Sequence, residues 1–573
     1  MHIFALGFDN QRKLTANNKQ KTFSDMSENL FLKEMTRGSG SSYTENGAKS
    51  YASIGTTLLD QFGKAGTNRG RDINAVFADQ AALYNENPDA ALKFPFYLRM
   101  ITRQTKLMDG KKTEKVQKGQ GARDEAFKRL LWFEKFHPDI YYKNLWLVPI
   151  VGSWKDLWVL LSMSEKPNKA EYFKVMAEGI NDADNKDLVK KYMPRIRSNN
   201  KCETTWAKST NELAKDFAKF AGWSYRDYRT FKASGVAHKF QTYMCSGLYS
   251  KINWATIPGK ALLNLVSGKF LKNHNLEDSY EKWLETQPVA KFNGYVYEFA
   301  RKLRTHYGIA SLPKTTQLTI DKQFANLIKT AKQDQGGIKG NVWVALDTSG
   351  SMNSMVDGVD LRAVELAKSL AIYFATLNEG AFHNYVMGFD NRAWLHKLSG
   401  ESFTEKWYGS MPNVGSGGTN FQSVIDEIIK IKRNRPEIPE SDFPQTIVVV
   451  SDMQFNPAGG YNWNRPTPSQ SEVQTNYEAV VSKLRNAGFS EDFLKNWKMV
   501  WWYCVNRNTK DYPSNMDCPG TYMFSGFDPA IVTLLLGGDA KVVDEKTGEV
   551  RNMTMQEMVD SALNQEVLTL LSR

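Results

Sequence analysis

The spacing of apolar side chains divides the chain into a long helical region and a later region in which strands and helices alternate. Across residues 51–330, apolar residues recur at intervals of three and four with short polar breaks, as in Leu58, Leu59 and Phe62. This period is typical of amphipathic helices. It predicts an all-α domain of stacked helices, a helical-repeat solenoid or a bundle, although no fixed repeat length is evident.

Short apolar runs mark the second region, after a glycine-containing linker at residues 331–340. Val342–Leu346 and Thr446–Val450 have the nearly continuous apolar composition of parallel strands that are buried on both faces. The alternation continues through residues 361–377, 383–389, 421–432, 477–486, 498–505 and 527–536. This rhythm predicts a doubly wound α/β domain over residues 341–540, with a parallel sheet and helices on both faces.

The two ends of the chain have a different character. Residues 1–50 run into a stretch rich in glycine and serine, which predicts a flexible N-terminal arm. Residues 541–573 predict a hairpin around Lys546 followed by a closing helix from Thr554. The chain is therefore expected to be multidomain.

A pattern of oxygen-bearing side chains follows the first strand of the α/β region. Asp347, Ser349 and Ser351 alternate along the loop after Leu346, so that their side chains can converge on one point. Oxygen ligands of this kind select a hard cation such as Mg²⁺. The segment is therefore a candidate part of a metal site.

Two later segments offer the oxygens that would complete such a site. The glycine-rich loop Gly415–Phe421 carries Thr419 ahead of an amphipathic helix, and the strand Thr446–Val450 is followed by Asp452. In open α/β sheets, ligands bind beyond the carboxyl ends of the strands. The alternative is that Asp347 and Asp452 are only turn residues and helix caps, roles that aspartate favours for local hydrogen bonding.

Length and composition limit the remaining possibilities. At 573 residues, with 41% hydrophobic and 12% aromatic residues, the chain is expected to form two to four folded domains. It has no apolar run long enough to span a membrane and no secretory signal at Met1–Asp9. Its four cysteines lack metal-binding spacing and suit a reducing compartment, so we expect a cytoplasmic protein.

Charge is distributed unevenly along the chain. Residues 341–573 contain 20 Lys and Arg against 28 Asp and Glu; of totals of 74 and 62, this leaves 54 against 34 for residues 1–340. The first part therefore has a balance of +20 and the second of −8. A strongly basic region predicts a polyanionic partner such as RNA, while the alternative is that the lysines only keep a large helical domain soluble.

Basic residues are concentrated at two places, which we take as candidate RNA-binding positions. They are Arg103, Lys106, Lys111, Lys112, Lys115, Lys118 and Arg123 in the first, and Lys190, Lys191, Arg195, Arg197, Arg226 and Arg229 in the second. The nearby aromatic residues are Tyr192, Trp206, Trp223, Tyr225 and Tyr228. Bases of single-stranded RNA stack on such rings, although aromatic residues at helical spacing more often belong to a core.

These motifs resemble two known families. The Asp347, Ser349, Ser351, Thr419 and Asp452 pattern resembles the metal-ion-dependent adhesion site of the von Willebrand factor A fold. The segments Gly119–Phe127, Gly152–Leu157, Tyr225–Arg229 and Ile257–Ala261 resemble the helical TROVE module of Ro ribonucleoproteins, in which a von Willebrand A domain follows. The resemblance extends over residues 55–573 and implies a ring of helical repeats that binds structured and misfolded RNA.

The sequence therefore favours a non-enzymatic RNA-binding protein with a Mg²⁺-dependent site that docks an acidic partner. No histidine adjoins the metal motif to act as general base, and no Walker loop, CxxC pair or Gly-x-Ser-x-Gly elbow occurs. Two alternatives stay open. One is a metal-dependent protein-docking or assembly module without RNA, in a viral or chaperone-like complex. The other is metal-assisted phosphodiester hydrolysis.

Overall fold

The computed structural model describes residues 41–107, 110–197, 204–234, 239–286, 292, 294–335, 337–409, 417–458, 474–505, 511–527, 541–543, 548 and 550–573. Residues 41–573 belong to one compact unit. Most of the predicted arm, and nearly all of the predicted element at 527–536, lie outside the described residues. Within the described part, no helix combines the length and the apolar character that a bilayer crossing requires.

The end of the predicted arm forms a hairpin. Strand β1 (Ser41–Tyr43) pairs antiparallel with β2 (Lys49–Tyr51). In the turn between them, the Gly47 amide donates to the Thr44 carbonyl at 2.9 Å, and Gly47 adopts a φ of 83°. An Asn-Gly pair supports such a turn because glycine adopts positive φ without strain. The polar composition of this stretch therefore reflects turn chemistry.

Helices make up most of the described residues from 57 to 335, apart from their connections and a long non-helical segment at residues 100–122, which confirms the predicted helical region. The α-helices are α2 (Thr57–Ala65), α3 (Ile73–Glu86), α4 (Pro88–Arg99), α5 (Arg123–Phe136), α6 (Pro138–Asn144), α7 (Leu147–Val151), α8 (Trp154–Met163), α9 (Lys169–Asn181), α10 (Lys186–Tyr192), α11 (Thr205–Phe220), α12 (Tyr225–Ala233), α13 (Lys239–Cys245), α14 (Gly259–Val266), α15 (Phe270–Asn273), α16 (Glu277–Thr286), α17 (Tyr297–Leu303) and α18 (Lys314–Gln335). Helices close in sequence contact one another, as in the groups α3–α5 and α8–α10. A regular repeat stays a prediction.

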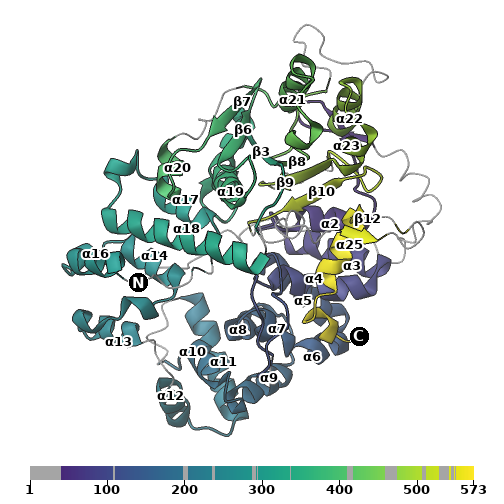
Figure 1. Cartoon of the computed structure of the whole chain (residues 1–573). Coiled ribbons are helices and arrows are strands. Elements are labelled where there is room, and N and C mark those ends of the chain that lie inside the picture. The colour runs from purple at the N-terminus through teal and green to yellow at the C-terminus, as the bar shows by residue number, and fades with distance from the viewer. Residues whose placement is uncertain are drawn as a thin grey trace, which may run out of the picture. The chain divides into compact units, whose positions relative to one another are not determined.

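A six-stranded sheet forms the core of the C-terminal region, with the order β10-β9-β8-β3-β6-β7 (Figure 1). Its strands are β3 (Val342–Asp347), β6 (Tyr385–Phe389), β7 (Ala393–Lys397), β8 (Thr446–Ser451), β9 (Lys498–Tyr503) and β10 (Thr521–Ser525). The short pairs β4 (Met355–Val356) with β5 (Leu361–Arg362), and β11 (Lys541–Val543) with β12 (Val550–Asn552), lie outside it.

One strand runs against the others, so the prediction of an all-parallel sheet was wrong. β7 pairs antiparallel with β6, while the other neighbouring pairs are parallel. Only residues 390–392 separate β6 from β7. A connection this short can join antiparallel strands only, because a parallel return needs a crossover of a dozen or more residues. The sheet is therefore mixed.

Helices and loops cover both faces of this sheet. The helices of the region are α19 (Ala363–Leu377), α20 (Phe403–Gly409), α21 (Gln422–Asn434), α22 (Asn476–Asn486), α23 (Glu491–Asn496) and α25 (Met555–Leu563). Trp502 of β9 contacts Phe374 of α19, with ring centroids 5.7 Å apart. The adjacent Trp501 contacts Phe421 at 5.3 Å, just before α21. Successive strand residues point to opposite faces, so these two contacts mark the two covered faces.

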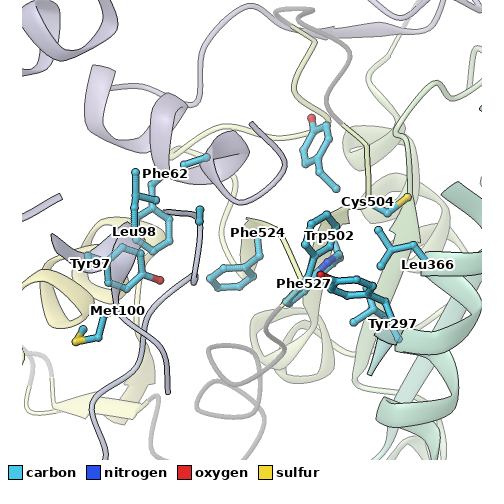
Figure 2. Close-up of a cluster of buried hydrophobic side chains, with 14 of the residues drawn as sticks. Phe62, Tyr97, Leu98, Met100, Tyr297, Leu366, Trp502, Cys504, Phe524 and Phe527 are labelled. Atoms are coloured by element: carbon cyan, nitrogen blue, oxygen red, sulfur yellow. The ribbon is translucent and has the colours of Figure 1, made fainter. Parts of the chain in front are cut away.

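The helical region and the sheet share one hydrophobic core. Figure 2 shows Phe62 of α2, Phe524 of β10 and Trp502 of β9 in this cluster. On the other side of Trp502, Tyr297 of α17 contacts Phe527 with a centroid distance of 5.0 Å. Because such aromatic side chains bury large apolar areas, the contact between the two regions is part of the fold.

Gly66 provides a test of this joint core. It follows α2, and a Cβ at this position would lie 2.4 Å from the Ser525 carbonyl oxygen and 2.6 Å from Gly526 Cα. We expect Gly66→Ala to lower the free energy of unfolding by about 1–3 kcal/mol, since the backbone at the end of β10 would have to move. Chemical denaturation measures this. Gly308→Ala is the control, because nothing lies within 4 Å of a Cβ there; equal losses in both variants would contradict the close approach.

Candidate functional site

Two buried carboxylates lie at the carboxyl edge of the sheet. Asp347 is the last residue of β3, and Asp452 follows the end of the neighbouring parallel strand β8. Their exposed fractions are 0% and 1%. Burial, and then the negative charge of Asp452, raise the pKa of Asp347 to about 7. The two predicted aspartates therefore lie close enough to repel each other.

The carboxylate of Asp347 is held by local donors. The Ser451 hydroxyl donates to Asp347 Oδ2 at 2.6 Å, and the Ser349 amide donates to Oδ1 at 2.9 Å. The sequence pattern did not indicate the hydrogen bond from Ser451, although this residue lies immediately before Asp452. The one feature that could have indicated it is the position of Ser451 at the end of the strand next to β3.

The three residues of the first loop lie as their alternation predicts. The hydroxyl oxygens of Ser349 and Ser351 lie 3.2 Å apart. Thr348, which precedes Ser349, points away from these two hydroxyls, and its own hydroxyl donates to the Phe389 carbonyl at 3.1 Å. The loop therefore presents two serine oxygens and one carboxylate together.

Thr419 approaches from the second loop. The Gly350 amide donates to the Gly417 carbonyl at 3.2 Å, which joins this loop to the first one. On the other side, the Asn456 amide donates to the Thr419 carbonyl at 2.9 Å, and Asn456 Oδ1 accepts from the Thr419 amide at 3.3 Å. Residues 411–416, which include Gly415, lie outside the described residues. Thr419 is buried between the segments that carry the other candidate ligands.

The chemistry of this donor set fits a hard divalent cation. Two carboxylates and three hydroxyls offer oxygen ligands only, a set that Mg²⁺ accepts when water completes the coordination. Among the described residues, no group of three or more histidine, cysteine, aspartate or glutamate side chains could hold a metal ion. A metal here would therefore depend on the serine and threonine hydroxyls as well as on Asp347 and Asp452.

The N-terminal hairpin lies against this site. Asn46 Nδ2, in the turn between β1 and β2, donates to the Gln454 carbonyl at 2.5 Å and lies 3.5 Å from Thr419 Oγ1. The Thr44 hydroxyl donates to the Phe455 carbonyl at 2.7 Å. About 400 residues separate these partners in sequence, so no local pattern could have indicated the contact.

Most of the second group of predicted RNA-binding residues gathers on one surface. Helix α12 packs against α10 and the segment after it: the Tyr228 hydroxyl donates to the Pro194 carbonyl at 2.8 Å, and Arg229 Nε donates to the Ile196 carbonyl at 3.3 Å. We call the exposed cations brought together here the basic surface. They are Lys191, Arg195, Arg197, Arg226 and Arg229.

Two lysines at this place are largely withdrawn from solvent. Lys190 is buried, and its ammonium lies 4.6 Å from the centre of the Phe231 ring. Lys232, which the sequence analysis did not include, donates to the Lys190 carbonyl at 3.1 Å. Burial, and then the charge of Arg195, lower the pKa of Lys232 to about 8. Arg195 is therefore close enough to Lys232 for the two positive charges to repel each other.

In the first predicted group, the side chains of Arg103 and Lys106 have partners within the protein. Arg103 Nη2 donates to the carbonyls of Ile150 and Gly152 at 3.1 and 3.2 Å, and Lys106 forms an ion pair with Asp184 at 2.7 Å. Of the other members, Lys111, Lys112, Lys115 and Arg123 are exposed and Lys118 is partly buried.

The C-terminal segment holds the end of this basic loop. The Lys118 amide donates to Gln565 Oε1 at 2.5 Å, and the Val567 amide donates to Gln117 Oε1 at 3.1 Å. These contacts give the residues after α25 a structural role that the sequence analysis could not derive. They also fix part of the loop that carries the first group of candidate RNA-binding residues.

The aromatic residues near the basic surface divide into core and surface positions. Tyr228 is fully buried, so it cannot stack on a base in this structure. Trp223 and Tyr192 are half-buried against the core, whereas Tyr225 is 39% exposed. The Trp206 side chain lies outside the described residues. Among Tyr192, Trp223, Tyr225 and Tyr228, the ring of Tyr225 is therefore the most accessible.

Comparisons with known proteins show what the chain is similar to. Residues 343–569 match a family described as Domain of unknown function (DUF7788). The chain is 23% identical over 533 residues to the uncharacterized protein L728 of Acanthamoeba polyphaga mimivirus, covering 87% of this chain and 85% of that protein. The crystal structure of the Deinococcus radiodurans RO (RSR) protein matches with a TM-score of 0.34 and 12% identity, over 72% of this chain and 86% of that one. The chain thus resembles a viral protein over most of its length.

Proposed function

We propose that this protein is a non-enzymatic RNA-binding protein whose helical region binds phosphates through the basic surface. The observation that carries the proposal is the packing of α12 against the segment after α10. It gathers five exposed cations from two separate segments, and no acidic partner is found among the described residues for Arg195, Arg197 or Arg226. Unpaired guanidinium groups are suited to bind phosphate oxygens.

The surroundings of the basic surface favour RNA over other polyanions. The exposed ring of Tyr225 begins α12, the helix that carries Arg226 and Arg229. Single-stranded RNA presents unstacked bases that pack on aromatic rings while its phosphates contact cations. A surface that combines the two therefore suits single strands or loops of RNA.

The oxygen cluster at the sheet edge supports a second part of the proposal, a divalent cation site. Asp347, Ser349, Ser351, Thr419 and Asp452 would hold Mg²⁺, which would offset the repulsion between the two buried carboxylates. We infer a binding rather than a catalytic site because both carboxylates would serve as ligands of the ion, and no histidine adjoins the metal motif in the sequence to act as a general base.

A protein-docking or assembly function without RNA is the second candidate. The observation that favours it is that the candidate oxygen ligands lie beyond the carboxyl ends of neighbouring parallel strands, the place where open α/β sheets bind ligands. A cation at this edge could accept a carboxylate from a partner.

The double variant Arg195→Glu, Arg197→Glu tests RNA binding. We expect affinity for a single-stranded RNA to fall about tenfold to a hundredfold, because two phosphate contacts become repulsive. We also expect the slope of log affinity against log salt to decrease by about 1.4, which is roughly 0.7 for each lost phosphate contact. Fluorescence anisotropy across a KCl series measures both quantities.

The control is the equally charged double variant Lys329→Glu, Arg433→Glu, whose exposed side chains lie away from the basic surface in sequence. This control changes the net charge by the same amount but leaves the basic surface intact. Its affinity for RNA should therefore stay within a few fold of that of the unsubstituted protein. Equal losses in the two double variants would mean that overall charge alone drives binding. No binding by the unsubstituted protein at low salt would reject the RNA proposal.

Asp347→Asn tests the cation site. We expect Mg²⁺ at a hundred times its dissociation constant to stabilise the unsubstituted protein by about 2.7 kcal/mol, and to leave the variant unchanged. In EDTA the variant should be the more stable of the two, because it removes one charge from a repulsive buried pair. Thermal unfolding followed by tryptophan fluorescence measures both effects.

Asp357→Asn is the matched control, since this exposed carboxylate belongs to the same region. It should respond to Mg²⁺ as the unsubstituted protein does. The Asp347 variant also separates the two candidate functions: unchanged RNA affinity is expected of the basic surface, while loss of a copurifying protein partner would favour docking. A Mg²⁺ response that survives Asp347→Asn would contradict the proposed site.

A further inference from the structure

The turn of the N-terminal hairpin contacts two of the three segments that form the proposed cation site. Asn46 Nδ2 lies 3.5 Å from Thr419 Oγ1, the hydroxyl of a proposed ligand. The same amide donates to the Gln454 carbonyl at 2.5 Å, two residues after Asp452. Next to it, the Thr44 hydroxyl donates to the Phe455 carbonyl at 2.7 Å. The turn therefore joins the Thr419 loop to the segment after β8.

Gln454 connects the turn to a proposed ligand through its own backbone and side chain. Its amide donates to Asp452 Oδ1 at 3.3 Å, and its Oε1 accepts from the Glu45 amide at 2.6 Å. Its Nε2 donates to Asp511 Oδ2 at 2.6 Å, and Asp511 pairs with the buried Lys64 of α2 at 3.3 Å. One residue thus contacts the cation site, the hairpin turn and an ion pair of the helical region.

The far end of the hairpin is attached as well. The Tyr51 amide donates to the Tyr512 carbonyl at 2.8 Å, and the Tyr512 amide donates to the Tyr51 carbonyl at 2.8 Å. Tyr512 follows Asp511, the partner of Gln454. The hairpin is therefore held at its turn by the site and at its second strand by the segment next to Asp511.

We propose that this hairpin docks on the sheet edge that holds the cation, and that Asn46 positions the Thr419 hydroxyl to bind the ion. This rests on the proposed cation site. The Asn46 amide holds Thr419 Oγ1 by donating to one of its lone pairs, and the other lone pair stays available to a cation. The hairpin contacts this edge through Thr44, Glu45 and Asn46, at a place where Asp347, Thr419 and Asp452 are all buried.

Cation binding and hairpin docking should then reinforce each other. An ion that orders Thr419 and Asp452 also orders the acceptors to which the hairpin turn donates. By linkage, a docked hairpin must strengthen ion binding by the same factor by which the ion strengthens docking. A hairpin that merely competed with the ion would show the opposite sign.

The variant Asn46→Ala tests this coupling in the full chain. We expect its affinity for Mg²⁺, measured by isothermal titration calorimetry, to be three- to tenfold weaker, the effect of losing one partly buried hydrogen-bond donor of about 1 kcal/mol. Hydrogen exchange with mass spectrometry supplies a second readout. In the unsubstituted protein, the amides of residues 44–51 should exchange faster in EDTA than in Mg²⁺, and in Asn46→Ala this difference should shrink.

Asn496→Ala is the control, because Asn496 is exposed and its side-chain amide donates within α23, to the Asp492 carbonyl. It should leave both readouts unchanged. Tighter Mg²⁺ binding by Asn46→Ala would overturn the inference in favour of competition, and unchanged affinity would also overturn it. Both results would leave the proposed cation site intact, whereas absence of Mg²⁺ binding to the unsubstituted protein would end the proposed site and this inference together.

Discussion

The repulsion between two buried carboxylates is the constraint around which the carboxyl edge of the sheet is built. Asp347 and Asp452 follow adjacent parallel strands, and neither is exposed to solvent that would screen its charge. A buried charge is tolerated when donors or an opposite charge surround it. Here Ser451, the Ser349 amide and the Gln454 amide each donate to one of the two carboxylates. These contacts fix the loops that emerge from the two strands.

Gln454 also ties the sheet edge to the helical region, because its side chain donates to Asp511, the partner of Lys64. Lys64 of α2 is buried, and burial lowers its pKa while Asp511 acts in the opposite direction. Its ammonium lies 4.4 Å from the centre of the Tyr512 ring. Removing either partner would leave an uncompensated buried charge, which is far more costly than the loss of an exposed ion pair. The ion pair thus specifies how α2 meets the sheet, while the aromatic core contributes most of the buried apolar surface.

An element or a site residue could be predicted from the sequence wherever one short segment contains the entire pattern that identifies it. Val342–Leu346 reads as a buried strand because its residues are apolar without interruption, and Asp347 stands out because a carboxylate ends that run. The antiparallel strand Ala393–Lys397 was missed since its half-buried pattern, with His396 and Lys397, lacks such a run. Asn46 and Gln454 could not be found, because their contact exists only after two segments far apart in the sequence meet in the fold.

The two proposed binding functions depend on separate parts of the structure. The basic surface arises from one local contact between neighbouring helices, α10 and α12, and needs no residue from the sheet. The cation site needs oxygens from three distant segments, and the hairpin adds a fourth. The local contact between α10 and α12 survives small changes elsewhere in the fold. A site assembled from four segments is sensitive to a change in any one of those segments. The proposed anion binding at α10 and α12 should therefore survive changes at the sheet edge, whereas the proposed cation site should respond to changes at Lys64 of α2, which pairs with the partner of Gln454.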